Sequence, residues 1–355
     1  MNTFGHKLTL TTFGESHGVA IGGVVDGFPA GIKIDVDFIQ NELDKRRPGK
    51  NKFATARDEC DRVEIFSGIF DGISTGTPIG FAIFNQNQKS NDYENLREIF
   101  RPAHADFTYF KKYGIRDHRG GGRSSARETA VRVAGGAFAQ LLLNEFDISV
   151  KSGVLSVGDV MADELDWDLA DKSEIFALGS ENKMKELIMK IREEHDSIGA
   201  SVLSEASGLP VGLGEGLYNK LDAALAGALM GINGVKAVEI GEGINASRLK
   251  GSQNNDQMDS NGFLSNHAGG VLGGMSSGEQ VVIKTHFKPT PSIFKSQKTQ
   301  NLNSECVDFE LRGRHDPCIG IRGSVVTTAM IRLVVADMLL LNSCTNIKNL
   351  KKIYR

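Results

Sequence analysis

The sequence has few cysteines, and they are widely spaced. Four occur among 355 residues, and no two of them form a CxxC pair. This scarcity argues against a disulfide framework and against a cysteine-based zinc site, and it is typical of proteins in a reducing compartment. The four are Cys60, Cys306, Cys318 and Cys344.

A secretory signal and long hydrophobic runs are also lacking. The opening residues, MNTFGHKLTLTTFGESHG, show no basic stretch followed by an apolar one, so no signal peptide is predicted. The longest apolar stretch, 325–341, contains Arg332 and Asp337, which argues against a membrane span. We therefore expect a cytoplasmic protein with no membrane association.

An excess of positive charge is absent as well. The chain has 41 Lys and Arg residues against 44 Asp and Glu, a formal net charge of −3. This balance argues against a general affinity for nucleic acid, so the arginine clusters should serve a local site. The sequence has no HExxH motif and no carboxylate cluster with metal-ligand spacing, and we expect no catalytic metal.

Proline is scarce, with 8 residues, whereas glycine contributes 41. The glycines follow no collagen-like period and form no flexible linker, so we expect a single domain over 1–355. Helical apolar spacing and short alternating runs are intermingled without a regular strand–helix–strand repeat, which predicts an α+β fold rather than a doubly wound sheet. Helices are predicted at 36–47, 126–146, 180–195, 217–232 and 325–341, and strands at 20–29 and 63–85.

Two long segments, 47–62 and 86–100, are polar and show neither helical apolar spacing nor the alternation of a strand. Loops of this length without structure of their own often cover a functional site. We predict that both are mobile and act as lids.

The most unusual segment is RDHRGGGRSSARET at 116–129. Glycine triplets have a high entropic cost on folding, and the arginines around this one repel one another unless an anion lies among them. Helical apolar spacing begins at Ala126, with Ser124 or Ser125 as the natural N-cap. A glycine-rich turn before a helix exposes backbone N–H groups, and the helix dipole favours negative charge, so we predict an anion-binding site. The arginines are Arg116, Arg119, Arg123 and Arg127.

Five further blocks carry candidate chemistry. GESHG (14–18) places Ser16 and His17 in a glycine-flanked turn, where an imidazole can approach a ligand closely. Taken singly, each block has a structural alternative: a turn histidine, a basic helix end, an ordinary proline turn or a surface ion-pair cluster. The other four are KRRPGKNKFATAR (45–57), RPAHAD (101–106), KPTPS (288–292) and GRHDPC (313–318).

The common nucleotide motifs are poorly matched. The triplet is not followed by Lys-Ser/Thr as in a P-loop, and it is not a GxGxxG turn after a strand as in a dinucleotide-binding fold. What is present is a basic site with histidines, hydroxyls and an arginine-flanked carboxylate. That inventory suits a small, multiply anionic substrate handled by proton transfer.

Taken together and in order, eight blocks resemble the chorismate synthase family, from about Leu8 to Leu341. The resemblance implies a carbon–oxygen lyase that catalyses the last step of the shikimate pathway, toward the aromatic amino acids. In that step 5-enolpyruvylshikimate-3-phosphate loses phosphate and a C6 proton by 1,4-anti elimination to give chorismate. It also implies reduced FMN as a cofactor without net redox change, a homotetramer, and β-sheets that sandwich a helical core. The blocks are GESHG, RRPG, RPAHAD, RGGGRSSARET, GINGVKAVEIG, NHAGGVLGGMSSG, KPTPS and GRHDPC.

The resemblance further implies a role for individual residues. His17 would protonate the leaving phosphate with Ser16 in a proton relay, and His104 would protonate the reduced flavin. Asp316, with Ser125 nearby, would take the proton from flavin N5. The substrate-binding cations would be Arg46, Lys52, Arg101, Arg127 and Arg314. The FMN contacts would come from Arg123, Ser124, Ser125, Asn233, Gly234, Gly273, Gly274, Lys288, Pro289, Thr290, Pro291, Ser292 and Arg314.

The source of the reduced flavin is open. Some family members reduce their own FMN with NADPH, and the resemblance would then assign NADP binding to Arg46 and Lys52. Lys52 stands where many members carry an arginine, so the charge is kept but bidentate recognition is not. The residues alone also leave two other functions open: a flavin- or phosphometabolite-binding module without catalysis, and a flavin oxidoreductase. The lack of a separate nicotinamide domain counts against built-in flavin reduction.

Overall fold

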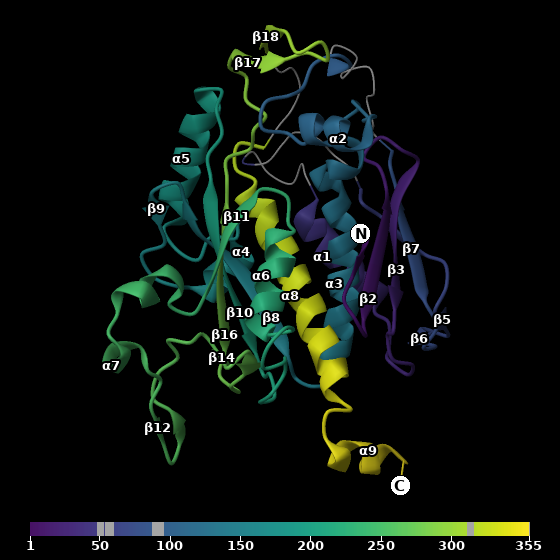
Figure 1. The fold of residues 1–355 in the computed structure, drawn as a ribbon, viewed down its shortest axis with the longest axis vertical. Coiled ribbons are helices and arrows are strands. Elements are labelled where there is room, and N and C mark those ends of the chain that lie inside the picture. Colours follow the sequence, from purple (N-terminus) through teal and green to yellow (C-terminus); the bar gives the residue numbers. More distant parts are fainter. Residues whose placement is uncertain (48–52, 54–59, 87–95, 311–315, 355) are drawn as a thin grey trace.

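Two five-stranded antiparallel sheets form the outer layers of the molecule (Figure 1). The computed structural model describes residues 1–47, 53, 60–86, 96–310 and 316–354. The first sheet has the order β1-β2-β3-β7-β4, with strands Thr3–Phe4, Thr9–Gly14, Ala20–Asp26, Ile79–Phe84 and Val63–Ile65. The second has the order β11-β16-β10-β8-β9, with strands Val235–Ile240, Val281–Phe287, Ala200–Ser207, Ser149–Val157 and Val160–Met161.

Helices fill the space between the two sheets (Figure 1). α3 packs on β2 and β3 of the first sheet, whereas α8 packs on β8, β10 and β16 of the second. α3 and α8 also pack against each other, with α1 and α6 beside them. The predicted α+β fold with sheets around a helical core is therefore confirmed. These helices are α1 (Val36–Arg46), α3 (Thr129–Asn144), α6 (Leu221–Met230) and α8 (Gly320–Asn342).

Shorter elements lie around this sandwich. The remaining helices are α2 (Asp106–Tyr113), α4 (Trp167–Lys172), α5 (Glu181–Glu193), α7 (Gly251–Asn254) and α9 (Ile347–Tyr354), with 3₁₀ turns η2 (Gly122–Ser124), η3 (Ala126–Glu128) and η4 (Gly243–Arg248). The remaining strands pair as β5 (Ile69–Phe70) with β6 (Ile73–Ser74), β12 (Met258–Asp259) with β13 (Gly262–Phe263), β14 (Val271–Leu272) with β15 (Met275–Ser276), and β17 (Gln297–Gln300) with β18 (Cys306–Phe309).

α3 and α8 are apolar around most of their circumference, which is the pattern of a helix buried on all sides. They approach each other closely at Gly136, where a Cβ atom would lie 2.5 Å from Ala329 Cα. By length and composition alone α8 could cross a membrane, but 83% of its apolar window is buried inside the molecule. It is the central core helix of the sandwich.

The predicted helix boundaries hold best for α1 and α5. The helices expected at 36–47 and 180–195 are α1 and α5. The helix expected at 325–341 begins earlier, at Gly320, because a glycine start carries little helical signal. The helix expected at 126–146 opens with η3 and becomes α-helical only at Thr129, and the one expected at 217–232 begins at Leu221.

The segments predicted to be lids, 47–62 and 86–100, lie largely outside the described residues. Their described parts contain buried side chains. Phe53 packs in a core cluster, Leu96 packs against Phe309, and the side chain of Asp61 is fully buried. Both segments are therefore anchored to the body at these points, and their closure over a ligand stays a prediction.

A buried carboxylate of α1 forms an ion pair with α8. Glu42 is 4% exposed, and it forms ion pairs with Arg332 of α8 and with Lys45 of its own helix. Burial alone would raise the pKa of Glu42, but the charges and hydrogen bonds of Arg332 and Lys45 hold that pKa below its ordinary value of 4.5. Ionised Glu42 therefore stabilises the folded state above about pH 4.5, and the contribution is lost as the pH falls through the lowered pKa.

Glu42→Gln should lower the free energy of unfolding at pH 7 by about 3–5 kcal/mol, because Arg332 then stays buried without its counter-charge. The difference from the wild type should shrink as the pH falls from about 4.5 through the lowered pKa, since Glu42 is protonated first in the unfolded chain and then in the folded one. Urea unfolding at several pH values measures both effects. Asp308→Asn, which breaks the exposed Lys298–Asp308 pair, is the control and should leave the unfolding curve unchanged. A difference that does not depend on pH would contradict this account.

Candidate active site

The glycine triplet packs against the GESHG turn. Gly120, Gly121 and Gly122 have φ values of +64°, +87° and +54°, a backbone conformation that L side chains rarely adopt. A Cβ atom on Gly120 would overlap the ring of His17, and one on Gly121 would lie 3.2 Å from a guanidinium nitrogen of Arg101. The triplet is required both by its conformation and by the close approach of two predicted site residues.

Ser16 and His17 are buried in this contact, at 1% and 5% exposure. Ser16 Oγ lies 3.1 Å from His17 Nδ1 and 3.4 Å from the carbonyl oxygen of Gly120. The backbone N–H of Ser16 donates to the carbonyl oxygen of Gly122 at 3.3 Å. A hydroxyl group both donates and accepts, so this contact can carry a proton to or from the imidazole.

Arg46 and Arg127 meet at the carboxylate of Asp61. Arg46 NH1 is 3.0 Å from Asp61 Oδ2, and Arg127 NH1 donates to Asp61 Oδ1. The three side chains are almost fully buried. Asp61 also has a φ of +44°, an uncommon conformation for a residue with a Cβ atom, and such backbone strain is often found at functional sites.

Arg101 is held by a second carboxylate, Asp106. Its Nε and NH2 donate to the two oxygens of Asp106 at 2.8 Å each, in a bidentate pair. Burial alone would raise the pKa of Asp106, but the hydrogen bonds and charge of Arg101 hold that pKa below its ordinary value. Arg116 lies 3.7 Å from the same carboxylate and donates to the carbonyl oxygens of Leu96, Arg97 and Ile99.

The four arginines near the triplet lie against four different carboxylates of the protein, with Arg123 3.7 Å from Glu128. Arg116 is held by Asp106 and the backbone as above, and Arg119 pairs with Asp117 within its own loop. Arg127 pairs with Asp61. The protein supplies its own carboxylates, because buried guanidinium groups remain charged and need counter-charges.

The RPAHAD turn and the KPTPS loop meet across the molecule. His104 Nε2 lies 3.0 Å from Ser292 Oγ, and His104 Nδ1 lies 2.9 Å from the carbonyl oxygen of Pro102. Lys288 Nζ donates to the carbonyl oxygen of Ala103 at 3.1 Å. Burial, with a further effect of the Lys236 charge, lowers the pKa of Lys288 from its ordinary value.

Further hydrogen bonds join this pair of loops to the start of η3. The backbone N–H of Lys288 donates to the carbonyl oxygen of Gly234 at 2.9 Å, and Asn233 Nδ2 donates to the carbonyl oxygen of Ser124 at 3.0 Å. Ser125 is the N-cap of η3, as predicted, with its hydroxyl accepting from the N–H of Arg127.

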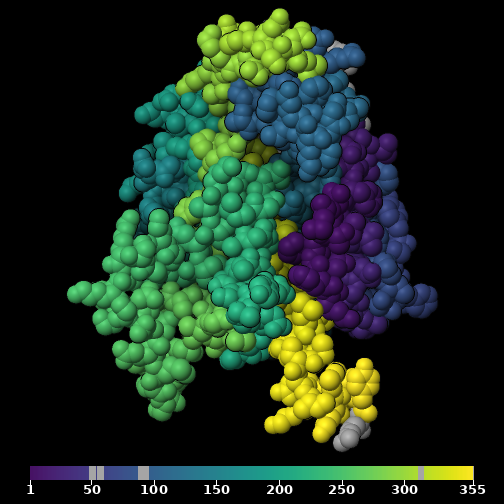
Figure 2. All heavy atoms as spheres, viewed as in Figure 1, coloured from purple at the N-terminus to yellow at the C-terminus, as the bar shows by residue number. Residues whose placement is uncertain are grey.

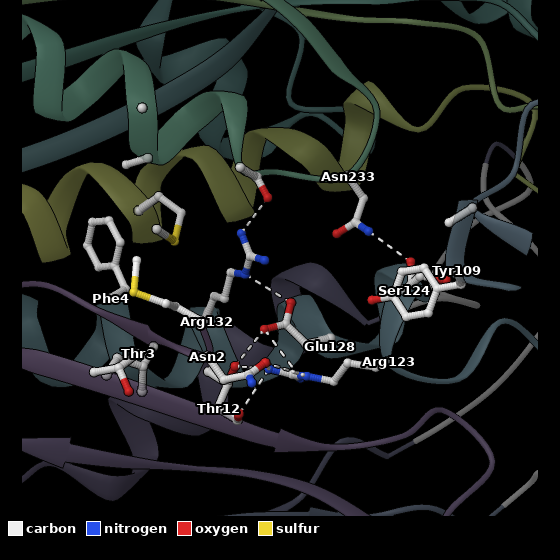
Figure 3. Close-up of a pocket in the computed structure, with 17 residues that line it drawn as sticks. Asn2, Thr3, Phe4, Thr12, Tyr109, Arg123, Ser124, Glu128, Arg132 and Asn233 are labelled. Carbon is white, nitrogen blue, oxygen red and sulfur yellow. Dashed lines mark hydrogen bonds and ion pairs between the residues drawn. The ribbon is translucent and has the colours of Figure 1, made fainter. Parts of the chain in front are cut away.

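Arg123, Ser124 and Asn233 line a cavity of about 460 Å³ (Figure 3). Glu128 lies at its centre in the figure: its carboxylate accepts from Arg132 Nε at 2.9 Å and from Thr12 Oγ1 at 3.1 Å, and Arg123 NH1 lies 3.7 Å away. Glu128 and Arg132 were not among the residues predicted for the site. The lining residues also include Met1, Asn2, Thr3, Phe4, Leu10, Ala105, Tyr109, Gly227, Ala228, Gly231 and Met330.

Two helix N-termini lie beside these loops. η3, which leads into α3, adjoins Asn233 through Ser124, and the residue before α8, Ile319, lies within van der Waals distance of the Cβ position of Gly234. The positive ends of both helix dipoles therefore face the same region. The sequence predicted a helix N-terminus at this place only for the helix that follows Ser125. The N-terminus of α8 is seen here only in the structure.

Asp316 lies just before α8 and is 7% exposed. Its carboxylate forms an ion pair with Arg322. The next residue, Pro317, accepts from the N–H of Ile198, whose neighbour Ser197 donates to the carbonyl oxygen of Thr290. The segment that carries Asp316 and the KPTPS loop therefore both contact residues 197–198. Two other predicted site residues, Lys52 and Arg314, lie outside the described residues.

Gly273 and Gly274 lie at the other end of α6 from Asn233, and their predicted contact with the cofactor stays a prediction. The carbonyl oxygen of Gly274 accepts from the N–H of Leu221, the first residue of α6, whereas Asn233 follows the last turn of that helix. A helix of 10 residues spans about 15 Å. The length of α6 therefore separates these glycines from Asn233.

The structure adds three polar residues that the sequence analysis missed. Asp61 and Asp106 are the counter-charges of the predicted arginines, and Asn85 accepts from Arg127 Nε at 3.1 Å. One signal was available: several buried arginines imply acidic partners elsewhere in the chain. Spacing alone could not say which of the 44 acidic residues they are.

Among the described residues, neither the free cysteines nor any cluster of metal-ligand side chains forms a further candidate site. Cys60, Cys306, Cys318 and Cys344 are unpaired, and burial raises the pKa of the Cys318 thiol to about 12. In the part of the chain that the structure describes, no three His, Cys, Asp or Glu side chains are placed to hold a metal ion.

Comparisons with known proteins agree on one family. The family model of chorismate synthase matches residues 8–340. Chorismate synthases of Campylobacter curvus and Campylobacter concisus are 78% and 75% identical over 354 residues, which cover 100% of each chain. A crystal structure of chorismate synthase aligns with 99% of this chain and 97% of its own, with a TM-score of 0.77 and 28% identity. The chain therefore belongs to the chorismate synthase family and is an enzyme, a carbon–oxygen lyase that acts on phosphates.

Proposed function

We propose that the chain converts 5-enolpyruvylshikimate-3-phosphate to chorismate by 1,4-anti elimination of phosphate and the C6 proton, with reduced FMN and no net redox change. The observation that carries the proposal is the contact between the buried Ser16–His17 pair and the glycine triplet, with Arg101 against the same triplet. It brings a proton donor and a cation to one loop, which is what the loss of a phosphate requires.

Three buried arginines suit the substrate, which carries two carboxylates and a phosphate. Arg46, Arg101 and Arg127 are each 3–7% exposed, and each is already oriented by a carboxylate of the protein. Each charge-assisted hydrogen bond to the substrate would contribute about 1.5–3 kcal/mol to binding. Lys52 and Arg314 are proposed as further cations on the resemblance alone.

His17 is proposed as the general acid for the departing phosphate. Ser16 Oγ is in contact with His17 Nδ1, so the serine can exchange a proton with the ring as the histidine gives one up. Positioned proton transfer of this kind contributes roughly 10²–10⁴-fold to a rate.

The residues proposed to hold FMN fit a ligand with many polar atoms. Arg123 NH1, Asn233 Oδ1 and Thr290 Oγ1 are buried and have no hydrogen-bond partner within the described residues. Buried polar atoms in native proteins are nearly always paired, so these three suit contacts with a bound molecule. When bound, reduced FMN supplies electron density to the substrate as phosphate leaves and regains it afterwards.

His104 and Asp316 are proposed to handle protons on the cofactor side of the site. Contacts at both ring nitrogens, with Pro102 O and Ser292 Oγ, fix the orientation of His104. The ion pair with Arg322 holds the carboxylate of Asp316 in one orientation. Ser125, which is fixed as the N-cap of η3, is proposed to assist Asp316 on the resemblance alone.

The source of reduced FMN is proposed to be external, with NADPH as the alternative. Arg46, which the NADP assignment would require, is 3% exposed and donates to Asp61, Thr129 and the carbonyl oxygen of Ala126. These internal contacts favour a role inside the site over one at a surface nicotinamide site. Lys52, the second residue of that assignment, lies outside the described residues.

We also propose a homotetramer in the cytoplasm. The segment that carries α7 and β12 and the C-terminal α9 project from the body (Figure 2). Exposed apolar side chains on them, including Ile244, Met258, Leu264 and Ile353, support burial against other copies of the chain.

Activity should require reduced FMN without consuming it, because the elimination has no net redox change. An anaerobic assay with 5-enolpyruvylshikimate-3-phosphate and a small amount of chemically reduced FMN should release many equivalents of phosphate per flavin, together with diene absorbance. Consumption of one reduced flavin per turnover would instead identify an oxidoreductase.

His17→Ala and Arg127→Ala should affect different steps. His17→Ala removes the acid but keeps the cations, so substrate should bind at near-normal affinity while the elimination slows by about 10–10⁴-fold. Arg127→Ala should weaken binding by roughly 2–5 kcal/mol, because it removes a cation from a buried polyanion. Asp316→Asn should behave like His17→Ala.

Single-turnover kinetics with pre-reduced FMN separate the two classes. Arg119→Ala is the matched control for Arg127→Ala, because Arg119 lies in the same segment, 116–129, but pairs with Asp117 in an exposed position. It should leave binding and rate unchanged. Loss of binding with a normal chemical rate in His17→Ala would mean that the GESHG turn only binds the ligand.

Gly120→Ala should slow the elimination by roughly 100-fold, because the added methyl group displaces His17, and a shift of about 1 Å has an effect of this size. Gly114→Ala is the matched control: its φ of +74° is equally unfavourable for alanine, but nothing lies within 4 Å of its Cβ position. Rate measurements on both variants check this. An equal loss in the two would point to backbone strain instead.

A further inference from the structure

Asn85 holds the turn that carries His17. It follows β7 directly, and its backbone N–H donates to the carbonyl oxygen of Val19 at 3.0 Å. Its side-chain Nδ2 donates to the carbonyl oxygens of Glu15 at 3.1 Å and Gly18 at 2.9 Å. These two carbonyls flank Ser16 and His17, so one amide group spans the turn.

The other end of the same amide holds Arg127. Asn85 Oδ1 accepts from Arg127 Nε at 3.1 Å. An amide has two N–H donors and one carbonyl oxygen, and each of them has a partner here. The side chain of Asn85 therefore links the His17 turn to Arg127 with no donor left over.

Asp61 links Arg127 to Arg46. Its two carboxylate oxygens accept from NH1 of Arg127 and from NH1 of Arg46, the latter at 3.0 Å. Arg46 is fixed further by Thr129 Oγ1 at 3.1 Å and by the carbonyl oxygen of Ala126 at 3.0 Å. Arg127 is thus bound on two sides of its guanidinium group, by Asn85 at Nε and by Asp61 at NH1.

We propose that Asn85 and Asp61 are positioning residues that hold Arg127 in one orientation between the His17 turn and Arg46. The proposal rests on the proposed function, in which His17 acts on the leaving phosphate and the two arginines bind the substrate. The network orders the flexible side chain of Arg127 before the substrate arrives. Binding of the substrate then costs less side-chain entropy. The positions of the acid and of the cations are set by one connected network.

Asn85→Ala is the decisive variant. Asn85 is only partly buried, so the fold should survive its loss. We expect kcat to fall and KM to rise, by roughly 10–100-fold together in kcat/KM. The effect on KM should disappear in an Arg127→Ala background, and the effect on kcat should disappear in a His17→Ala background, because the residue through which Asn85 acts is then absent. Equal effects in all backgrounds would overturn the proposal.

Gln140→Ala is the matched control. Gln140 also uses one amide nitrogen to donate to two oxygens, those of Asn144 and Ile148, but it lies three turns into α3, away from the site. It should lower the unfolding temperature and leave kcat and KM unchanged. A KM effect as large as that of Asn85→Ala would show that general loosening is enough.

Asp61→Asn tests the second half of the network. It should raise KM in the wild-type background and not in Arg127→Ala. This variant leaves two buried arginines without their counter-charge, and failure to fold would leave Asn85→Ala as the deciding test.

A binding assay separates this proposal from the proposed function. Calorimetric titration of 5-enolpyruvylshikimate-3-phosphate in the presence of oxidised FMN measures affinity without turnover. Wild-type binding that Asn85→Ala weakens only when Arg127 is present would support the network even if no elimination were detected, and only the reaction assignment would then fail. A wild-type chain that neither binds nor converts this substrate overturns both.

Discussion

The packing of α3 against α8 is the contact on which the rest of the structure depends. Gly136 lets the two helices approach closely at Ala329, and each helix then covers one of the two sheets. Since both helices are apolar nearly all round, neither could lie at a surface without a large loss of buried apolar area. Their starts come to the same end of the sandwich, near Asn233 and Gly234, where the loops of the candidate site gather.

Charge pairing is the second constraint, and it acts within that site. A guanidinium group cannot give up its proton on burial, so every arginine placed near the site needs a carboxylate or a ligand anion. Asp61 and Asp106 provide this in the chain itself. A site built for a polyanionic substrate would otherwise be strongly repulsive before the substrate binds. These carboxylates also orient the arginines. The same ion pairs that stabilise the fold therefore set the positions of the cations that are proposed to bind the substrate.

The glycine triplet links local sequence to this arrangement. Its unusual composition pointed to close backbone approach, and the structure identifies the neighbours as His17 and Arg101. The blocks GESHG, RPAHAD and KPTPS were also recognisable as candidate loops, and their contacts run through Gly120 and through the His104–Ser292 pair. Gly273 and Gly274 lie near the start of α6 and Asn233 lies beyond its end, a separation that the spacing of the motifs along the chain did not predict.

The sequence by itself determined the α+β class, the positions of most core helices, an N-cap at Ser124 or Ser125, and the residue types of the candidate site. These follow from periodicity, capping and composition, which are local properties of the chain. Only the tertiary structure decided that Asp61 joins Arg46 to Arg127, that Asn85 joins Arg127 to the His17 turn, and that α8 begins beside the same loops. The hydrogen-bonded partners in these contacts are 15 to 70 residues apart in the sequence, and any of the many carboxylates and amides could have satisfied the same arginines. Which of them did so depends on how the two sheets pack on the helices, and no local pattern records that choice.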